Sequence, residues 1–319
     1  MSIFRPLSDL PGRPVVVTIL ALAAAVLYGT ADFLGGVASR RASVFAVLAL
    51  TVPAGAVVML LVALLGQVPA IGGLLGHGGL GSSASVGDWS AVGWAAASGV
   101  CGAVGLVAFY AGFATAPISV VAPVAALVSA VLPVGVAIVG GERPAGTVIA
   151  GGLICLVAVV LVSAQPVDHG DGRGGGIRLV TSGRLRALGY GAAAGAGFGL
   201  FFICLKNAGQ SGVLWPVAIS RSAGTVVAFG IALGTRTRLP WGRGGITGIA
   251  LISGAIDAAA NVCYVLATRA GLFGLAVVIT SLYPGMTVLL ARVLLGERMR
   301  WLQRAGLLLA AAGVVLVTV

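Results

Sequence analysis

Long apolar runs, separated by short polar or Gly-rich segments, cover most of this chain. Each run spans about 18 to 24 residues, enough for a helix to cross a hydrocarbon core roughly 30 Å thick. The pattern therefore predicts an all-α integral membrane protein with ten transmembrane helices. The predicted spans are Val15–Val37, Val44–Leu65, Ala91–Phe113, Ile118–Val139, Thr147–Ala164, Leu188–Leu205, Leu214–Leu233, Ile246–Ala267, Leu272–Leu295 and Leu302–Val319.

The composition excludes a soluble domain. Of the 319 residues, 59% are hydrophobic and only 8% are charged, and the mean hydropathy is +1.12. Such a chain has too few polar side chains to cover a surface that faces water. A cleaved signal peptide is an alternative for the first run, because Arg5 and Arg13 precede the small residues of "LALAAAVLYG". A retained helix is favoured, since the run continues to Val37 and the next run follows at once.

Neither cysteine nor histidine is placed to form a disulfide framework or a metal site. The four cysteines fall singly on four predicted spans, at Cys101, Cys155, Cys204 and Cys263. His77 and His169 lie in Gly-rich segments without a second ligand nearby. We therefore expect no metal and no cofactor.

An internal duplication links the two halves of the chain. Residues 96–164 align with residues 251–319 without a gap, at an offset of 155. The alignment places Ser98-Gly99 on Ser253-Gly254, and Gly141-Glu142-Arg143 on Gly296-Glu297-Arg298. A charged tripeptide in the same register at the same helix junction is hard to obtain by chance in apolar sequence.

The duplication divides the ten spans into two halves of five. We expect a first five-helix repeat at residues 15–164, a polar Gly- and Arg-rich linker at residues 165–187, and a second five-helix repeat at residues 188–319. An odd number of crossings places the second half upside down relative to the first. The expected fold class is therefore two inverted five-helix repeats, with a cavity near the membrane midplane between them.

These features resemble the drug/metabolite transporter superfamily, specifically its EamA-type members. The resemblance rests on the ten spans, the duplication, the repeated Gly-Glu-Arg and the segment "SLYPGMTVLLARVLLGERM" at residues 281–299. It covers Val15 to Val319 and implies alternating access and export of small solutes such as amino acids, other metabolites or drugs. The first half departs from the pattern, because Ser129 stands where the second half has Pro284, and this argues against equal roles for the fourth and ninth helices.

Three ionisable residues lie deep within predicted spans: Asp32, Arg221 and Asp257. Each costs about 2.5 to 3.5 kcal/mol at a helix centre and usually faces a polar interior. Arg221 lies where EamA-type proteins often carry arginine, and its guanidinium suits a carboxylate of Asp32, of Asp257 or of an amino-acid substrate. Asp32 follows Tyr28 by four residues, and glycines lie near it in the sequence. In the alternative interpretation, Asp32 is a carboxylate at the end of its span that reaches water.

Asp257 shares one helical face with two other polar residues. Asn261 follows it by one turn and Tyr264 by two turns. This row of polar residues is consistent with a proton or substrate site. It is also consistent with a packed hydrogen bond between helices. The aligned position in the first half is Gly102, so the duplication did not carry this charge. Asp257, Asn261, Asp32 and Arg221 are the candidates for substrate contact or proton coupling.

Aromatic residues are candidates for lining the expected cavity, and lipid-facing packing is the alternative for each. They are Tyr28, Phe109, Tyr110, Phe198, Phe201, Phe202, Tyr264 and Tyr283. Pro123 and Pro284 interrupt their helices' hydrogen-bond ladders and are candidates for the bends that alternating access needs. Glu142 and Glu297 come at tight turns, where each is expected to cap the first amides of the next helix.

The formal net charge of +11 reflects arginines scattered among short loops, without the basic and aromatic module of a nucleic-acid-binding protein. Most of these arginines fall on the membrane side opposite to Arg5 and Arg13. The positive-inside rule would then place both termini outside, whereas the resemblance implies both inside. We favour the orientation that the resemblance implies.

These patterns favour a multi-pass secondary transporter of the cytoplasmic membrane, an exporter of a small amphipathic metabolite such as an amino acid. No Walker A pattern is present, so an ion gradient, protons included, or a substrate gradient would supply the energy. The expected partners are a small molecule and the lipid bilayer, with a homo-oligomer left open. One alternative is an intramembrane enzyme that acts on lipid through Asp32 and Asp257, and another is a membrane scaffold that does not transport.

Overall fold

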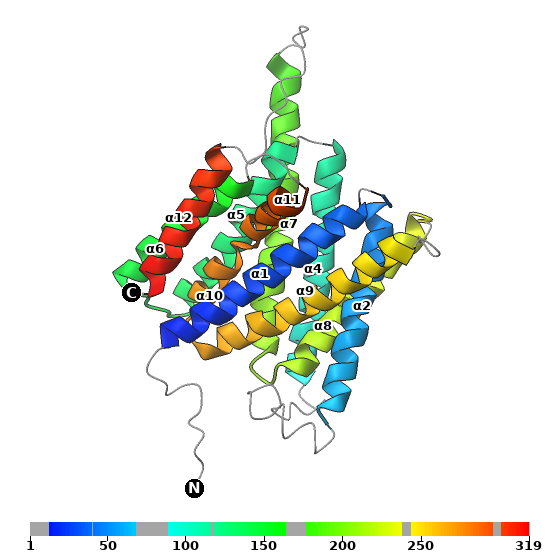
Figure 1. Ribbon diagram of the computed structural model, residues 1–319, viewed down its shortest axis with the longest axis horizontal. Coiled ribbons are helices and arrows are strands. Elements are labelled where there is room, and N and C mark those ends of the chain that lie inside the picture. Colours follow the sequence, from blue (N-terminus) through cyan, green and yellow to red (C-terminus); the bar gives the residue numbers. More distant parts are fainter. Residues whose placement is uncertain are drawn as a thin grey trace.

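Every regular element in the described part of the chain is a helix (Figure 1). The computed structural model describes residues 13–39, 41–67, 89–115, 118–163, 177–237, 244–295 and 301–318. The first half contains α1 (Arg13–Ser39), α2 (Val44–Leu65), α4 (Trp89–Thr115), α5 (Ile118–Val139) and α6 (Gly146–Ser163). The second half contains α7 (Ile177–Ala208), α8 (Leu214–Gly234), α9 (Gly244–Ala270), α10 (Phe273–Thr280), α11 (Tyr283–Leu295) and α12 (Trp301–Thr318).

The predicted spans coincide closely with these helices. α2 and α5 have the predicted bounds, and most of the others differ by one to three residues at each end. One difference is large, because α7 begins at Ile177, inside the segment 165–187 that was expected to be a linker. Hydropathy alone starts this helix at Leu188. Residues 177–187, however, contain one glycine and no proline, so nothing in their sequence prevents the helix from beginning earlier.

The ninth predicted span is two helices, α10 and α11, separated by a turn at Ser281 and Leu282. Pro284 follows this turn and has no N–H to donate to the carbonyl of Thr280. The local bonds tighten accordingly, with Leu282 N donating to Ile279 O at 3.1 Å and Gly285 N to Leu282 O at 2.8 Å. The backbone of α5 is continuous through Pro123, whose side chain lies outside the described residues.

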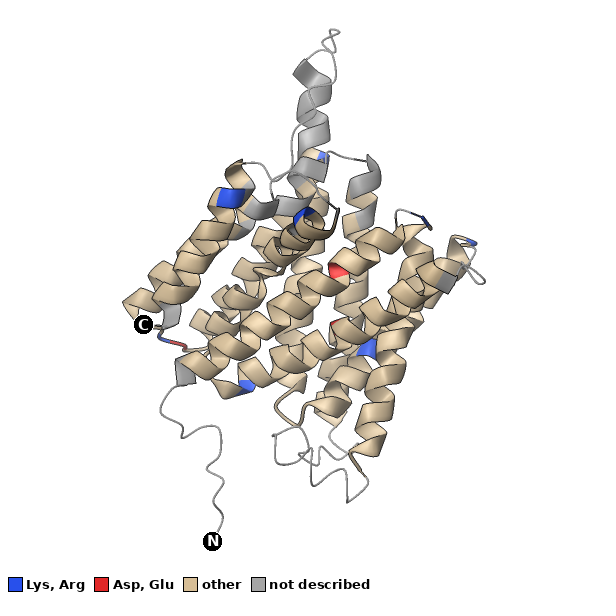
Figure 2. Cartoon of the chain, viewed as in Figure 1, with Lys and Arg blue, Asp and Glu red and all other residues tan. Residues whose placement is uncertain are grey.

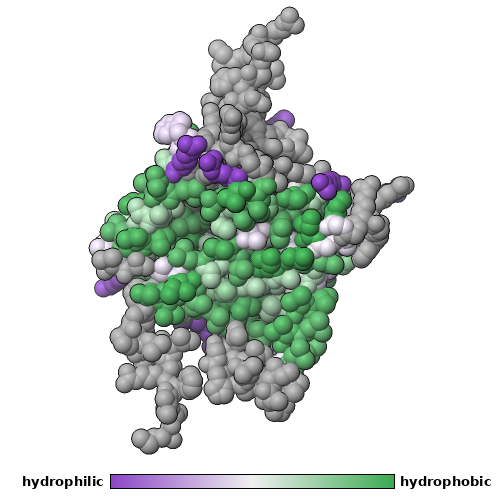
Figure 3. Space-filling view, viewed as in Figure 1, coloured by the Kyte–Doolittle hydropathy of each residue, from purple (hydrophilic) through white to green (hydrophobic). Residues whose placement is uncertain are grey.

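The surface of the bundle is apolar where a membrane would surround it. Seven helices in the described residues are long and apolar enough to cross a bilayer, and Val124–Val139, Gly146–Ala158 and Arg304–Leu316 are shorter apolar segments. Charged residues are sparse across the helical body (Figure 2), and the visible face is a hydrophobic belt with hydrophilic residues near its two margins (Figure 3). The protein is a multi-pass membrane protein.

The third and fifth helices of the two halves have matching boundaries. α9 begins and ends 155 residues after α4, α12 does the same relative to α6, and α10 begins 155 residues after α5. Packing follows the same correspondence: α4 lies on α7 and α8, and α9 lies on α1 and α2. α2 packs on α8, and α6 packs on α12.

Glu142, in the turn after α5, caps a helix of the other half. Its Oε1 accepts a hydrogen bond from Phe273 N at 2.8 Å, and its Oε2 accepts one from Gly274 N at 3.0 Å. These are the first amides of α10, so the expectation that Glu142 caps the following helix, α6, is wrong. A Cβ on Gly274 would lie 3.3 Å from Glu142 Oε2, so glycine leaves room for the carboxylate. The equivalent Glu297 lies outside the described residues.

We expect Glu142→Ala to lower the melting temperature of the purified protein. Two amides at the N-terminus of α10 would lose a charged acceptor, at a cost of about 1 to 3 kcal/mol. Arg143→Gln, which changes the exposed neighbour, is the matched control. An unchanged melting temperature for Glu142→Ala would show that the cap contributes nothing to stability.

Candidate functional site

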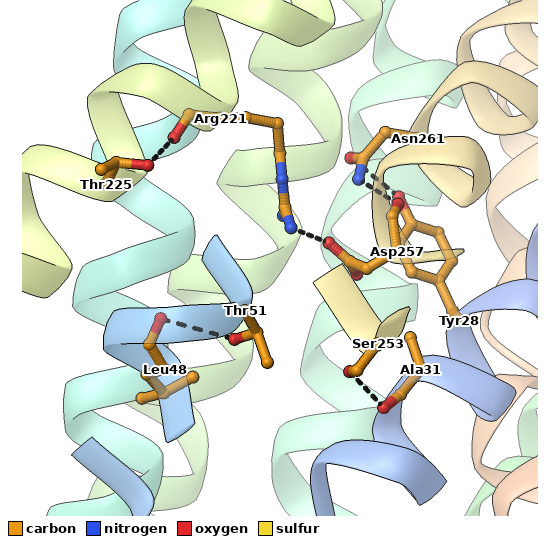
Figure 4. Close-up of polar contacts among 9 residues, drawn as sticks. All are labelled: Tyr28, Ala31, Leu48, Thr51, Arg221, Thr225, Ser253, Asp257 and Asn261. Atoms are coloured by element: carbon orange, nitrogen blue, oxygen red, sulfur yellow. Dashed lines mark hydrogen bonds and ion pairs between the residues drawn. The ribbon is translucent and has the colours of Figure 1, made fainter. Parts of the chain in front are cut away.

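An ion pair joins α8 to α9 in the interior of the bundle. Asp257 lies at the middle of α9, and its Oδ2 contacts Nη2 of Arg221 on α8 (Figure 4). Their side chains are 23% and 13% exposed, respectively, so the pair is largely but not completely enclosed. Two opposite charges in a membrane bundle are tolerated when they neutralise one another.

Asn261 connects this pair to α1. Its Nδ2 donates to the backbone carbonyl of Asp257 at 2.7 Å, and its Oδ1 accepts a hydrogen bond from the Tyr28 hydroxyl at 3.0 Å. One turn before Asp257, Ser253 donates to the carbonyl of Ala31 at 2.8 Å (Figure 4). Asn261 is 1% exposed, so its hydrogen bonds replace those that water would supply.

Glycines allow the helices around the ion pair to approach closely. Gly254 on α9 packs so tightly against the carbonyl of Thr51 on α2 that no Cβ would fit. A Cβ on Gly55 of α2 would lie 2.9 Å from Arg221 Nη2 and 3.0 Å from its Nε. That Nε is buried and has no hydrogen-bond partner among the residues that the structure describes. Gly55 therefore makes room for the guanidinium, which retains one unused donor.

The repeated Ser-Gly dipeptide packs helices in both halves. Ser98 donates to Ser220 at 2.6 Å, as Ser253 donates to Ala31. Gly99 lies against the carbonyl of Ser220 on α8 without room for a Cβ, as Gly254 lies against α2. The sequence alignment revealed this dipeptide but not its role, which depends on the neighbouring helix.

Four of the aromatic candidates form one cluster beside Asn261. The Tyr28 ring makes edge contacts with Phe202 and Tyr283, both at centroid distances of 6.2 Å, and Phe202 contacts Tyr264 at 4.8 Å. Tyr264 is fully buried, and its hydroxyl donates to the carbonyl of Phe202 at 2.9 Å. The cluster joins α1, α7, α9 and α11 next to the polar network.

The other aromatic candidates lie elsewhere or are not described. Phe109 and Phe198 pair with each other between α4 and α7, with ring centroids 5.9 Å apart. Phe201 contacts the cluster through Phe202, at a centroid distance of 5.2 Å. The side chain of Tyr110 lies outside the described residues.

Asp32 lies at the level of Asp257 but outside the hydrogen-bonded network. The contacts of Tyr28 with Asn261, and of Gly35 with Ser253, show that α1 and α9 are antiparallel. Asp32 comes midway between Tyr28 and Gly35, and its charge lies within electrostatic range of Asp257. Its side chain is exposed, and no cation within the described residues forms an ion pair with it.

Comparisons with known proteins place this arrangement in context. Residues 185–319 match the EamA-like transporter family. A solved crystal structure has the same fold, with a TM-score of 0.68 over 94% of this chain and 95% of that chain, at 18% sequence identity. No curated protein matches the chain. Within the described residues, no three His, Cys, Asp or Glu side chains are grouped as a metal site.

We expect Asp257→Asn to destabilise the protein strongly. The change leaves the Arg221 cation unpaired, at a cost of about 3 to 5 kcal/mol, and Arg221→Gln combined with Asp257→Asn should recover part of the loss. Asp32→Asn is the matched control, because it strands no cation. Thermal unfolding of the four proteins in one detergent measures the effect. If Asp257→Asn unfolds at the parental temperature, the pair does not stabilise the fold.

Proposed function

Because residues 185–319 belong to the EamA-like transporter family, we propose that this chain is a secondary active transporter of a cytoplasmic (inner) membrane. It exports a small amphipathic metabolite, such as an amino acid or a related compound, by alternating access. The observation that carries the proposal is the partly exposed Arg221–Asp257 pair at mid-helix, beside an aromatic cluster. Charge deep within a span is typical of a transport pathway.

The direction of helix packing supports an inverted repeat. Within each half, the first and third helices run the same way, because a single crossing in the opposite direction lies between them. Upright copies would therefore make α1 parallel to α9, and inverted copies would make them antiparallel. The contacts of Tyr28 with Asn261 and of Gly35 with Ser253 are those of an antiparallel pair. α4 and α7 are antiparallel as well, since Gly102 meets Phe201 and Gly112 meets Tyr190.

The polar groups of the site match a solute with both charged and apolar parts. Arg221 keeps one buried donor, Nε, without a partner within the described residues, and a guanidinium suits a substrate carboxylate. Asp32 offers a carboxylate that has no ion-pair partner within the described residues, for an ammonium group or a proton. The rings of Tyr28 and Tyr283 supply apolar contact at the same level of the bundle.

Of the two interior carboxylates, Asp32 is the better proton carrier. Asp257 contacts Arg221, so its carboxylate already has a charged partner. Asp32 has no such partner within the described residues, so its carboxylate remains available to a proton or a cation. We therefore assign proton coupling to Asp32 and a positioning role to Asp257.

Saturable transport by purified protein in proteoliposomes tests the proposal. Amino acids and amphipathic amines are first screened for compounds that raise the melting temperature, because a ligand of the folded state stabilises it. Radiolabelled hits should then show saturable counterflow that protein-free liposomes lack. Stabilising hits without counterflow would favour a non-transporting scaffold, and turnover of labelled phospholipid would favour the intramembrane enzyme.

We expect Asp32→Asn to separate exchange from coupling. Without a titratable carboxyl, substrate counterflow should continue, while net transport driven by a pH gradient should fall to the level without a gradient. Asp257→Asn, reconstituted at equal folded amount, is the comparison and should reduce both fluxes. Unchanged pH-driven transport in Asp32→Asn would overturn the assignment of Asp32.

A further inference from the structure

The break between α10 and α11 separates three backbone carbonyls from their helical donors. These are the carbonyls of Val278, Thr280 and Ser281. The amide that would serve the first belongs to Leu282, which donates to Ile279 O instead. Gly285 N likewise donates to Leu282 O rather than to the third carbonyl. Pro284, four residues after the second, has no N–H to donate.

A fourth oxygen at the same turn is the hydroxyl of Thr280. It is fully buried and has no hydrogen-bond partner among the residues that the structure describes. The neighbouring Ser281 differs, because its hydroxyl donates to the carbonyl of Val277 at 2.8 Å. Buried polar groups are normally paired, so an exception at a helix break calls for an explanation.

The break lies inside the bundle, not at its surface. Thr280 is 0% exposed and Ser281 is 1% exposed. α10 packs on α1, α5, α6 and α9 (Figure 1), and Gly29 of α1 lies against the carbonyl of Tyr283 just past the break. A bilayer supplies no donors to freed carbonyls, so another group must meet them. The C-terminal end of α10 also carries the negative end of its dipole, which favours a cation.

We propose that this turn is a sodium site, with the three carbonyls and the Thr280 hydroxyl as ligands. Hard cations prefer oxygen ligands, and unwound carbonyls of interrupted helices coordinate Na⁺ in secondary transporters. These four ligands include no carboxylate, which favours a monovalent ion over Ca²⁺ or Mg²⁺. Asp32, three residues after Gly29, places a negative charge on the helix that packs against the break.

A sodium ion at this turn gives the break a physical role. It joins the end of α10 to the start of α11 and holds the two helices at one angle. Tyr283 begins α11 and contacts Tyr28 of the aromatic cluster, so the ion fixes a wall of the candidate site. The inference goes beyond the proposed function, because it names an ion whose gradient that function does not specify.

Thermal unfolding of the purified full-length protein tests for the site. NaCl replaces choline chloride stepwise at constant ionic strength, and no substrate is added. We expect the melting temperature to rise with Na⁺ to a plateau, because an ion that binds the folded state stabilises it. KCl should give a smaller rise at each concentration.

Four variants locate the ion. Thr280→Val removes the hydroxyl at nearly constant volume and should raise the half-saturating Na⁺ concentration by about tenfold. Thr280→Ser, which keeps the hydroxyl, should respond like the parent. Pro284→Ala returns an N–H to the Thr280 carbonyl and should also weaken the response, which covers a failure of Thr280→Val to fold. Thr18→Val is the matched control, because Thr18 is a buried threonine of α1 whose hydroxyl also has no partner within the described residues.

Equal melting temperatures in NaCl and choline chloride would overturn the proposal and leave water as the partner of the turn. So would an unchanged half-saturating concentration in both Thr280→Val and Pro284→Ala, or an equal loss of response in Thr18→Val. A larger response to K⁺ would contradict the assignment to Na⁺. None of these measurements uses a substrate, so a failure here is distinct from a failure of the transport function.

Discussion

The ion pair between Arg221 and Asp257 is the interaction on which the arrangement of the central helices depends. Removing each charge from water costs several kcal/mol, and close pairing with further hydrogen bonds must offset that cost. Nη2 of Arg221 meets the carboxylate, while Asn261 and Tyr28 tie the same turn of α9 to α1. Gly55 gives the guanidinium its space on the α2 side. Four helices thus meet at one polar point, and a shift of any of them changes the surroundings of a buried charge.

Around this point, the two halves share a packing device but not their chemistry. The Ser-Gly dipeptide holds α4 on α8 and α9 on α2, with the glycine in each case leaving no room for a Cβ. At the aligned positions 102 and 257, however, the first half has a glycine beneath the ring of Phe201 and the second has the aspartate that pairs with Arg221. Backbone packing is therefore common to both halves, whereas the charge belongs to the second.

The sequence predicted what is local and missed what depends on neighbours. Apolar length is a local property, and it located the helices of the described residues, with the start of α7 and the division of the ninth span into α10 and α11 as the main errors. The cost of charge in a bilayer also singled out Asp32, Arg221 and Asp257. Hydropathy could not decide which carboxylate Arg221 contacts, because it does not tell which helix faces point toward each other. It could not foresee that Glu142 reaches α10, since backbone amides leave no signature in the sequence.

The asymmetry of the two halves bears on how such a bundle could work. If the halves are inverted copies, identical sequences would make the two alternating states equal in energy, and no ligand could favour either. Differences between the halves remove that equality. The second half carries Asp257, and its ninth span is interrupted next to Pro284, whereas α5 is continuous through the aligned Ser129. Tyr283 begins α11 at the interruption and contacts Tyr28, which bonds Asn261. A shift of α11 at the interruption would therefore reach Asn261, and the turn of α9 that carries Asp257, through Tyr283 and Tyr28.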